Sequence, residues 1–149
     1  MSLPQISIYE LLTTGIILII CCISDIKRNE IMYTPCFIGV LLSLIFPQRN
    51  LMESIGGALL GFLPLFITAL LGNGGGGDAI VAATLGFIYP LTNAAYIFLL
   101  ASSAYVLILS VIVLVIKDKK KQIPYIPFLM GSWLIITIFS ISQTGGILL

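Results

Sequence analysis

Two aspartates stand out because each lies at the edge of a long apolar stretch. Asp25 follows the uncharged run 11–24, and Asp78 follows the uncharged run 54–77. Acidic side chains in such places are costly unless they are paired, hydrated or used. Two carboxylates at one site share a proton, so that one can activate water while the other protonates a carbonyl oxygen. If the two aspartates meet, the chemistry they support is hydrolysis of a peptide bond.

Each aspartate taken alone also has a simple structural interpretation. Asp25 can belong to a solvated charged cluster, residues 25–30, at the edge of the membrane. Asp78 can be the N-cap of a helix, where its carboxylate accepts backbone N–H bonds. As a catalytic pair, Asp78 at a helix N-terminus is expected to stay ionised and act as the initial base. Asp25 at a helix C-terminus is expected to hold the proton and act as the initial acid.

A glycine-rich segment immediately precedes Asp78. Residues 72–78 contain five glycines, and Gly75, Gly76 and Gly77 adjoin the aspartate. Glycine carries an entropic cost unless a positive φ or a close backbone approach requires it. We therefore expect an extended substrate peptide to bind against these three glycines. A phosphate-binding loop is the weaker alternative, because the GxxxxGK[ST] pattern is absent and an aspartate would repel the anion.

The composition excludes most other chemistry and indicates an integral membrane protein. Of the 149 residues, 59% are hydrophobic, 9% are charged and none is histidine. Without histidine the chain has no Ser-His or Cys-His nucleophile pair and no HExxH zinc site. Cys21, Cys22 and Cys36 lack CxxC spacing and are expected to be lipid-facing or core residues, so we expect no metal and no cofactor. A net charge of +1 without a long basic stretch argues against nucleic acid as a partner.

The uncharged runs predict the elements that must position the aspartates. The expected fold class is an all-α membrane protein, a polytopic bundle of about six transmembrane helices in one domain, residues 1–149. A span takes roughly 20 residues, and the run 79–116 is long enough for two helices with a break at Pro90. A GxxxG pattern at Gly57 and Gly61 predicts the close approach of a neighbouring helix within the chain. The predicted helices are about 6–24, 31–47, 53–72, 79–90, 93–116 and 123–142.

The positions of lysine and arginine predict the orientation of the bundle. Lys27 and Arg28 follow the first helix, and four lysines within 117–121 follow the fifth, whereas the other loops contain only Arg49. Because cytoplasmic loops are enriched in basic residues, the odd-to-even loops are expected in the cytoplasm and the N-terminus outside. Both aspartates then lie at the cytoplasmic face.

These features resemble the type IV prepilin peptidases, the bacterial GxGD aspartyl proteases. Asp25 is followed by a basic residue and then by Ile31, and residues 75–78 match the GxGD pattern. The segment 123–129, IPYIPFL, is similar to a late I-P-F-G-P-F-L stretch of that family. The resemblance covers nearly the whole chain. It implies that Asp25 and Asp78 are the catalytic residues and that both face the cytoplasm.

The resemblance also implies a substrate and a location. The substrates would be prepilin or pseudopilin precursors of type IV pili and related secretion systems, with a short basic leader before an apolar helix. The enzyme would reside in the lipid bilayer of the inner, or cytoplasmic, membrane, and the oligomeric state is left open. The first span begins near Ile6, so a short form without methyltransferase activity is expected. The chain departs from the family at Met32 and Tyr33, in place of Pro-Asn, at Ile80, in place of a lysine, and at Ile126, in place of a glycine.

Two other functions remain as alternatives. A presenilin-like protease that cuts within a helix shares GxGD, but it typically has tyrosine where Ser24 precedes Asp25. A small polytopic transporter or pilus-assembly subunit would use the aspartates to bind protons or cations and the glycine segment as a hinge.

Overall fold

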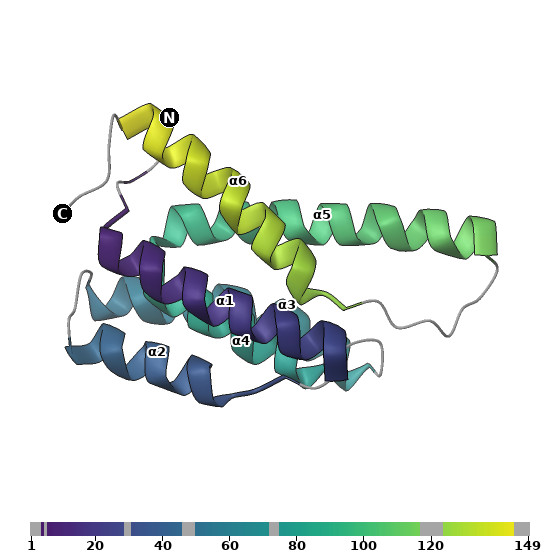
Figure 1. Ribbon diagram of the computed structural model, residues 1–149, viewed down its shortest axis with the longest axis horizontal. Helices are drawn as coiled ribbons and strands as arrows, with labels where there is room; N and C mark the ends of the chain where they lie inside the picture. Colours follow the sequence, from purple (N-terminus) through teal and green to yellow (C-terminus); the bar gives the residue numbers. More distant parts are fainter. Residues whose placement is uncertain are drawn as a thin grey trace.

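The computed structural model describes residues 4, 6–28, 31–45, 50–71, 75–116 and 124–144. These ranges are built from α-helices joined by short segments (Figure 1). The predicted all-helical fold and the predicted number of helices are confirmed. The helices are α1 (Ile8–Arg28), α2 (Thr34–Ile45), α3 (Leu51–Leu70), α4 (Gly76–Ile88), α5 (Leu91–Ile116) and α6 (Ile126–Thr144).

Successive helices run in opposite directions along the bundle (Figure 1). The C-terminal turn of α1 and the N-termini of α4 and α6 therefore lie at the same end, on the right in Figure 1. We call this the aspartate end, because Asp25 belongs to that turn of α1 and Asp78 to the first turn of α4. Residues 53 positions apart in the sequence thus reach one end of the molecule through the alternating direction of the helices.

Four of the helices are long and apolar enough to cross a membrane: α1, α3, α5 and α6. The other two, α2 with 12 residues and α4 with 13, are too short at 1.5 Å per residue to cross about 30 Å of hydrocarbon. The chain is a polytopic helical membrane protein. The second helix begins at Thr34 rather than at residue 31, and Pro35 lies in its first turn, where proline is tolerated because the N–H there has no helical partner.

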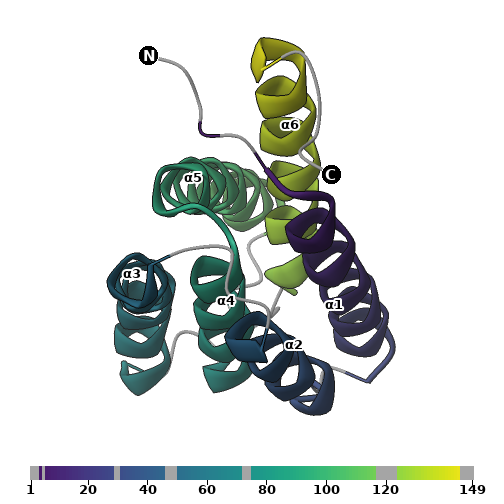
Figure 2. The same ribbon diagram turned by 90° about the vertical axis from the view of Figure 1, so that its left-hand side faces the viewer.

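The short helix α4 occupies the centre of the bundle (Figure 2). It contacts all five other helices, and most of its side chains are buried. Its closest neighbour is α3, because Gly57 of α3 packs directly on the backbone of Gly86 and Gly61 packs on Ala82. The predicted close approach at the GxxxG pattern is confirmed, and the partner is a helix of the same chain.

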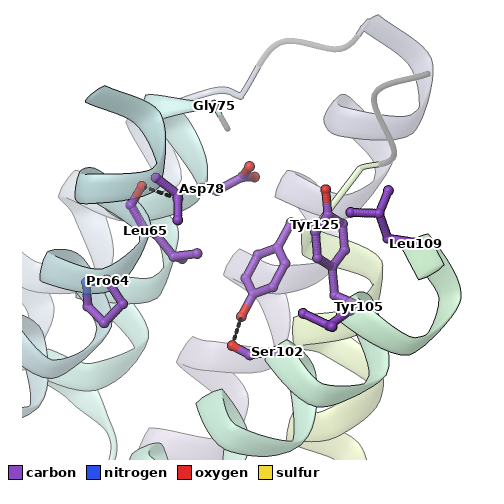
Figure 3. A pocket seen from close by; sticks show the side chains of 10 residues that line it. Pro64, Leu65, Gly75, Asp78, Ser102, Tyr105, Leu109 and Tyr125 are labelled. Carbon is purple, nitrogen blue, oxygen red and sulfur yellow. Dashed lines mark hydrogen bonds between the residues drawn. The ribbon is translucent and has the colours of Figure 1, made fainter. Parts of the chain in front are cut away.

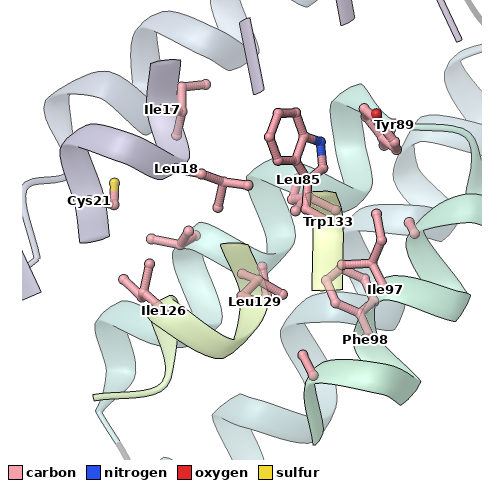
Figure 4. Close-up of a cluster of buried hydrophobic side chains, with 14 of the residues drawn as sticks. Ile17, Leu18, Cys21, Leu85, Tyr89, Ile97, Phe98, Ile126, Leu129 and Trp133 are labelled. Atoms are coloured by element: carbon pink, nitrogen blue, oxygen red, sulfur yellow. The ribbon is translucent and has the colours of Figure 1, made fainter. Parts of the chain in front are cut away.

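The hydrophobic core lies where α1, α4, α5 and α6 meet (Figure 4). Tyr89 at the end of α4 is fully buried and its hydroxyl lies 2.7 Å from Thr137 of α6. Cys21 and Cys36 are buried, as expected for core residues, with their sulfur atoms 3.9 Å apart. The labelled core side chains in Figure 4 are Ile17, Leu18, Cys21, Leu85, Tyr89, Ile97, Phe98, Ile126, Leu129 and Trp133.

Two helix boundaries at the aspartate end differ from the prediction, and both concern the candidate residues. The first helix continues past residue 24 to Arg28, so that Asp25 lies within its last turns rather than after its end. The fourth helix begins at Gly76, so that Asp78 is its third residue and Gly75 is its N-cap. The prediction that Asp78 is itself the N-cap is therefore wrong. Charged residues such as Lys27 and Arg28 are good helix formers, which is why the charge cluster does not end α1.

Candidate active site

Asp25 is buried against the start of α6. Its side chain is only 7% exposed, and its carboxylate accepts a hydrogen bond from the backbone N–H of Ile126, the first residue of α6. Its Oδ2 atom is buried and has no hydrogen-bond partner in the described part of the chain. The alternative in which Asp25 belongs to a solvated cluster is therefore wrong for this residue, although Lys27, two positions later, is exposed.

Asp78 is held by the first turn of its own helix. Its backbone N–H donates to the Gly75 carbonyl over 3.2 Å, and its carboxylate accepts a hydrogen bond from the Gly75 N–H. The third residue of a helix thus bonds back to the N-cap residue, as in a capping box. This pair of bonds fixes the carboxylate at the start of α4 and leaves it facing a cavity (Figure 3).

The two carboxylates interact electrostatically. Asp78 lies in the first turn of the short helix α4, outside the four helices that can span a membrane, and its ionisation depends on its surroundings there. Burial, and secondly the negative charge of Asp25, raise the pKa of Asp78 to about 6, although the Gly75 N–H bond acts in the opposite direction. A carboxyl group with this pKa is mainly ionised at pH 7 and lies in the range of a general base.

The carboxylate of Asp78 faces a cavity of about 310 Å³ between α3 and α5 (Figure 3). Most of its lining is apolar, and Asp25 is not part of the lining. The two aspartates therefore differ in position: Asp78 lines the cavity, and Asp25 is buried against the start of α6. The lining residues are Pro64, Leu65 and Thr68 of α3, Gly75 and Asp78, Ser102, Tyr105, Val106 and Leu109 of α5, and Tyr125.

The three glycines before Asp78 have different surroundings, and none of them has a positive φ. Gly75 lines the cavity next to the Asp78 carboxylate. Gly76 faces open space, whereas a Cβ atom on Gly77 would lie 2.6 Å from Ile31. The need for glycine at position 77 is therefore a close approach by the chain's own Ile31, and of the three only Gly75 adjoins the cavity that a substrate could enter.

Two tyrosines of the cavity were missed by sequence reasoning. The Tyr125 hydroxyl lies 3.3 Å from Ser102, and burial, together with the charge of Asp78, raises the pKa of Tyr125, which keeps this phenol protonated. Tyr105 stands edge-on to Tyr125 in the same wall. A signal existed, because Ser102, Tyr105 and Leu109 recur at helical spacing on one face of an otherwise apolar run. It could not be distinguished from core packing without the neighbouring helices.

Fold and site together define a helical membrane protein with two interacting carboxylates at one end of its bundle. A family model described as the type IV leader peptidase family matches residues 12–111, about two thirds of the chain. The chain therefore belongs to the type IV leader peptidase family, as the resemblance implied. The match includes Asp25 and Asp78 and ends before Tyr125. Comparisons with curated proteins and with solved structures gave no match.

Proposed function

We propose that this protein is a membrane aspartyl endopeptidase that removes the short basic leader from type IV prepilin or pseudopilin precursors, with Asp25 and Asp78 as its catalytic pair. The observation that carries the proposal is the electrostatic interaction of the two carboxyl groups at the aspartate end, one of them facing a cavity. The family membership supports peptide-bond hydrolysis as the reaction, and the absence of histidine from the chain leaves carboxylates as the obvious acid and base.

The reaction uses one proton shared between the two carboxyl groups. Asp78, mainly ionised at neutral pH, takes a proton from a water molecule in the cavity as that water attacks the carbonyl carbon of the scissile bond. Asp25, in its protonated form, donates to the carbonyl oxygen; its unpartnered Oδ2 is the atom suited to carry that proton. When the tetrahedral intermediate collapses, the C–N bond breaks and the leaving nitrogen takes the proton from Asp78. The proton returns from the hydroxyl to Asp25 and restores the pair.

The site is proposed to face the cytoplasm, with the N-terminus outside. Lys27 is exposed at the aspartate end, and in the sequence four lysines within 117–121, which lie outside the described residues, directly follow α5. Basic residues of short loops favour the cytoplasmic side. In this orientation the apolar helix of a precursor lies in the inner membrane while its leader reaches the two carboxylates from the cytoplasm.

The test is cleavage of a co-expressed prepilin, followed by mass spectrometry of the pilin N-terminus. Asp25→Asn and Asp78→Asn should each abolish the cut. An asparagine amide cannot accept a proton from water as Asp78 does, and it cannot transfer one to the carbonyl oxygen as Asp25 does. Glu53→Gln is the matched control: this carboxylate lies on α3 and accepts a hydrogen bond from the Leu91 N–H, away from the site, and its loss should leave cleavage intact.

The same measurement reads the cut site and shows whether the new N-terminus carries a methyl group; the resemblance to short family members predicts an unmethylated one. Normal cleavage by either aspartate variant would refute the catalytic pair. Proton-coupled uptake into liposomes that both substitutions abolish, without any cleavage by the wild type, would favour the transporter alternative.

A further inference from the structure

The cavity beside Asp78 contains several polar groups that the proposed chemistry does not use, and one of them is the hydroxyl of Tyr105. In Figure 3 this hydroxyl points toward the end of the cavity where Gly75 and Asp78 lie. Tyr105 and Asp78 line the same cavity. Within the described part of the chain the hydroxyl has no hydrogen-bond partner, and it is therefore available to a ligand.

The ring of Tyr105 is held in a fixed orientation. Its centroid lies 5.4 Å from that of Tyr125 and 5.6 Å from that of Phe128, both in edge-to-face geometry. Such edge-to-face contacts have a preferred geometry and stabilise the ring by more than the burial of its surface alone. Tyr125 itself is engaged, because its hydroxyl pairs with Ser102. Of the two phenols in this wall, one is thus occupied and the other is presented to the cavity.

The remaining walls are mostly apolar. Pro64 and Leu65 of α3 face Val106 and Leu109 of α5. These two helices are poorly buried in the bundle, each with 17% of its spanning window inside. A chain segment that approaches from the bilayer therefore meets apolar side chains first and the carboxylate and phenol at the far end.

The size of the cavity limits what it can hold. A volume of about 310 Å³ accommodates a few side chains, whereas a helix with its side chains is about 10 Å across. A substrate helix must therefore stay outside, with the residues next to its end drawn in as extended chain. Extended chain exposes backbone carbonyl groups, and a buried carbonyl needs a donor.

We propose that the cavity between α3 and α5 binds the apolar segment of the precursor next to the scissile bond, and that the Tyr105 hydroxyl donates a hydrogen bond to a backbone carbonyl of that segment. This inference rests on the proposed peptidase function. Tyr105 is in these terms a substrate-positioning residue opposite Asp78: the phenol donates, whereas the ionised carboxylate only accepts.

A second apolar groove, of about 350 Å³ between α1 and α2, is the competing place for the substrate. Its lining includes Tyr9, Ile16 and Ile38 but no carboxylate. Volume alone does not separate the two grooves. The presence of Asp78 in the α3–α5 cavity does, because the bond that is cut must lie beside a catalytic group.

Site-specific photo-crosslinking distinguishes these places. The photoreactive residue p-benzoylphenylalanine is introduced separately at Leu65 and Leu109 in the cavity, at Leu107, which is 67% exposed on α5 outside it, and at Ile16 in the second groove. Asp78→Asn enzyme is used so that the precursor stays uncut. We expect crosslinks to the prepilin from positions 65 and 109. Equal or stronger crosslinking from 107 or 16 would overturn the proposal.

Kinetics of Tyr105→Phe test the hydrogen bond. Loss of one hydrogen bond of about 1 kcal/mol corresponds to a roughly fivefold fall in kcat/KM, and we expect this fall mainly as a higher KM. Tyr96→Phe, at an exposed position of the same helix outside this cavity, is the matched control and should keep wild-type kinetics. An unchanged kcat/KM, or a loss that only follows a lower unfolding temperature, would refute the role of Tyr105.

Different results would refute the peptidase function and the substrate-binding site. If the wild type cuts no prepilin, or if the aspartate variants cut normally, the peptidase function itself is refuted. If the wild type cuts and the aspartate variants do not, while Tyr105→Phe and the crosslinks at 65 and 109 behave like their controls, only the binding site proposed here is refuted.

Discussion

Gly76 and Gly77 are neighbours in the first turn of α4, yet an added methyl group would meet different surroundings at each. At Gly77 the new Cβ would lie 2.6 Å from the Ile31 Cδ1 atom and 3.0 Å from its Cβ, whereas at Gly76 it would meet nothing within 4 Å. The Ile31 Cδ1 atom can rotate away, but its Cβ moves only with the backbone. Overpacking costs about 1–3 kcal/mol, and the better helix propensity of alanine offsets up to about 1 kcal/mol.

We therefore expect Gly77→Ala to lower the free energy of unfolding by about 1–2 kcal/mol and Gly76→Ala to leave it unchanged or raise it. The assay is unfolding in detergent micelles, followed by the fluorescence of the single tryptophan, Trp133, which is buried. Adding Ile31→Ala removes the closest contact, so the double variant should lose less stability than the sum of the single variants. Cleavage should fall more in Gly77→Ala, because Asp78 follows directly. If both alanines cost the same, or the two changes simply add, the Ile31 contact is not what requires glycine at position 77.

Other features predict measurable effects. The raised pKa of Asp78 predicts that cleavage declines as the pH falls below about 6, since a protonated carboxyl cannot accept a proton from water; a rate that stays constant down to pH 5 would contradict this. Because ionisation of a carboxyl with a raised pKa weakens the fold, Asp78→Asn should unfold at a higher temperature than the wild type above pH 6, and this difference should disappear below the unfolded value of 3.8. Tyr89→Phe removes the bond to Thr137 and should lower the free energy of unfolding by about 1 kcal/mol while cleavage continues. Gly57→Leu should disrupt the contact between α3 and α4, seen as reduced insertion or unfolding at lower temperature, whereas Gly56→Leu faces open space and should not.

The sequence predicted the helical framework because its signals are local. Pro90 does separate α4 from α5, and Gly57 does mark the α3–α4 contact. The end of α1 was misplaced because the charged residues after Asp25 continue the helix. The start of α4 was misplaced because two glycines, poor helix formers, occupy its first turn. Helix propensity thus favours the longer α1, whereas tertiary packing overrides propensity only at the start of α4.

Part of the site depends on packing between helices that are distant in the sequence, and local sequence patterns could not predict it. Alternating helix direction was enough to bring Asp25 and Asp78 to one end. The meeting of Asp25 with the start of α6 depends on the angle at which α6 crosses α1, which no local pattern encodes. Tyr105 could not be singled out because the role proposed for it depends on the facing wall of α3. Segment 123–129 was noticed only by resemblance, and its residue Ile126 proves to contact Asp25.

The contact with Ile126 changes the electrostatics expected from the sequence. Asp25 was expected to feel the negative end of its own helix, but the first N–H of α6 donates to it, just as the Gly75 N–H donates to Asp78. Each carboxylate thus lies at the positive end of a helix, which favours negative charge there. Burial and the repulsion between the two groups oppose a second charge. Both effects favour a pair that shares one proton, which is the state that the proposed hydrolysis by two carboxyl groups requires.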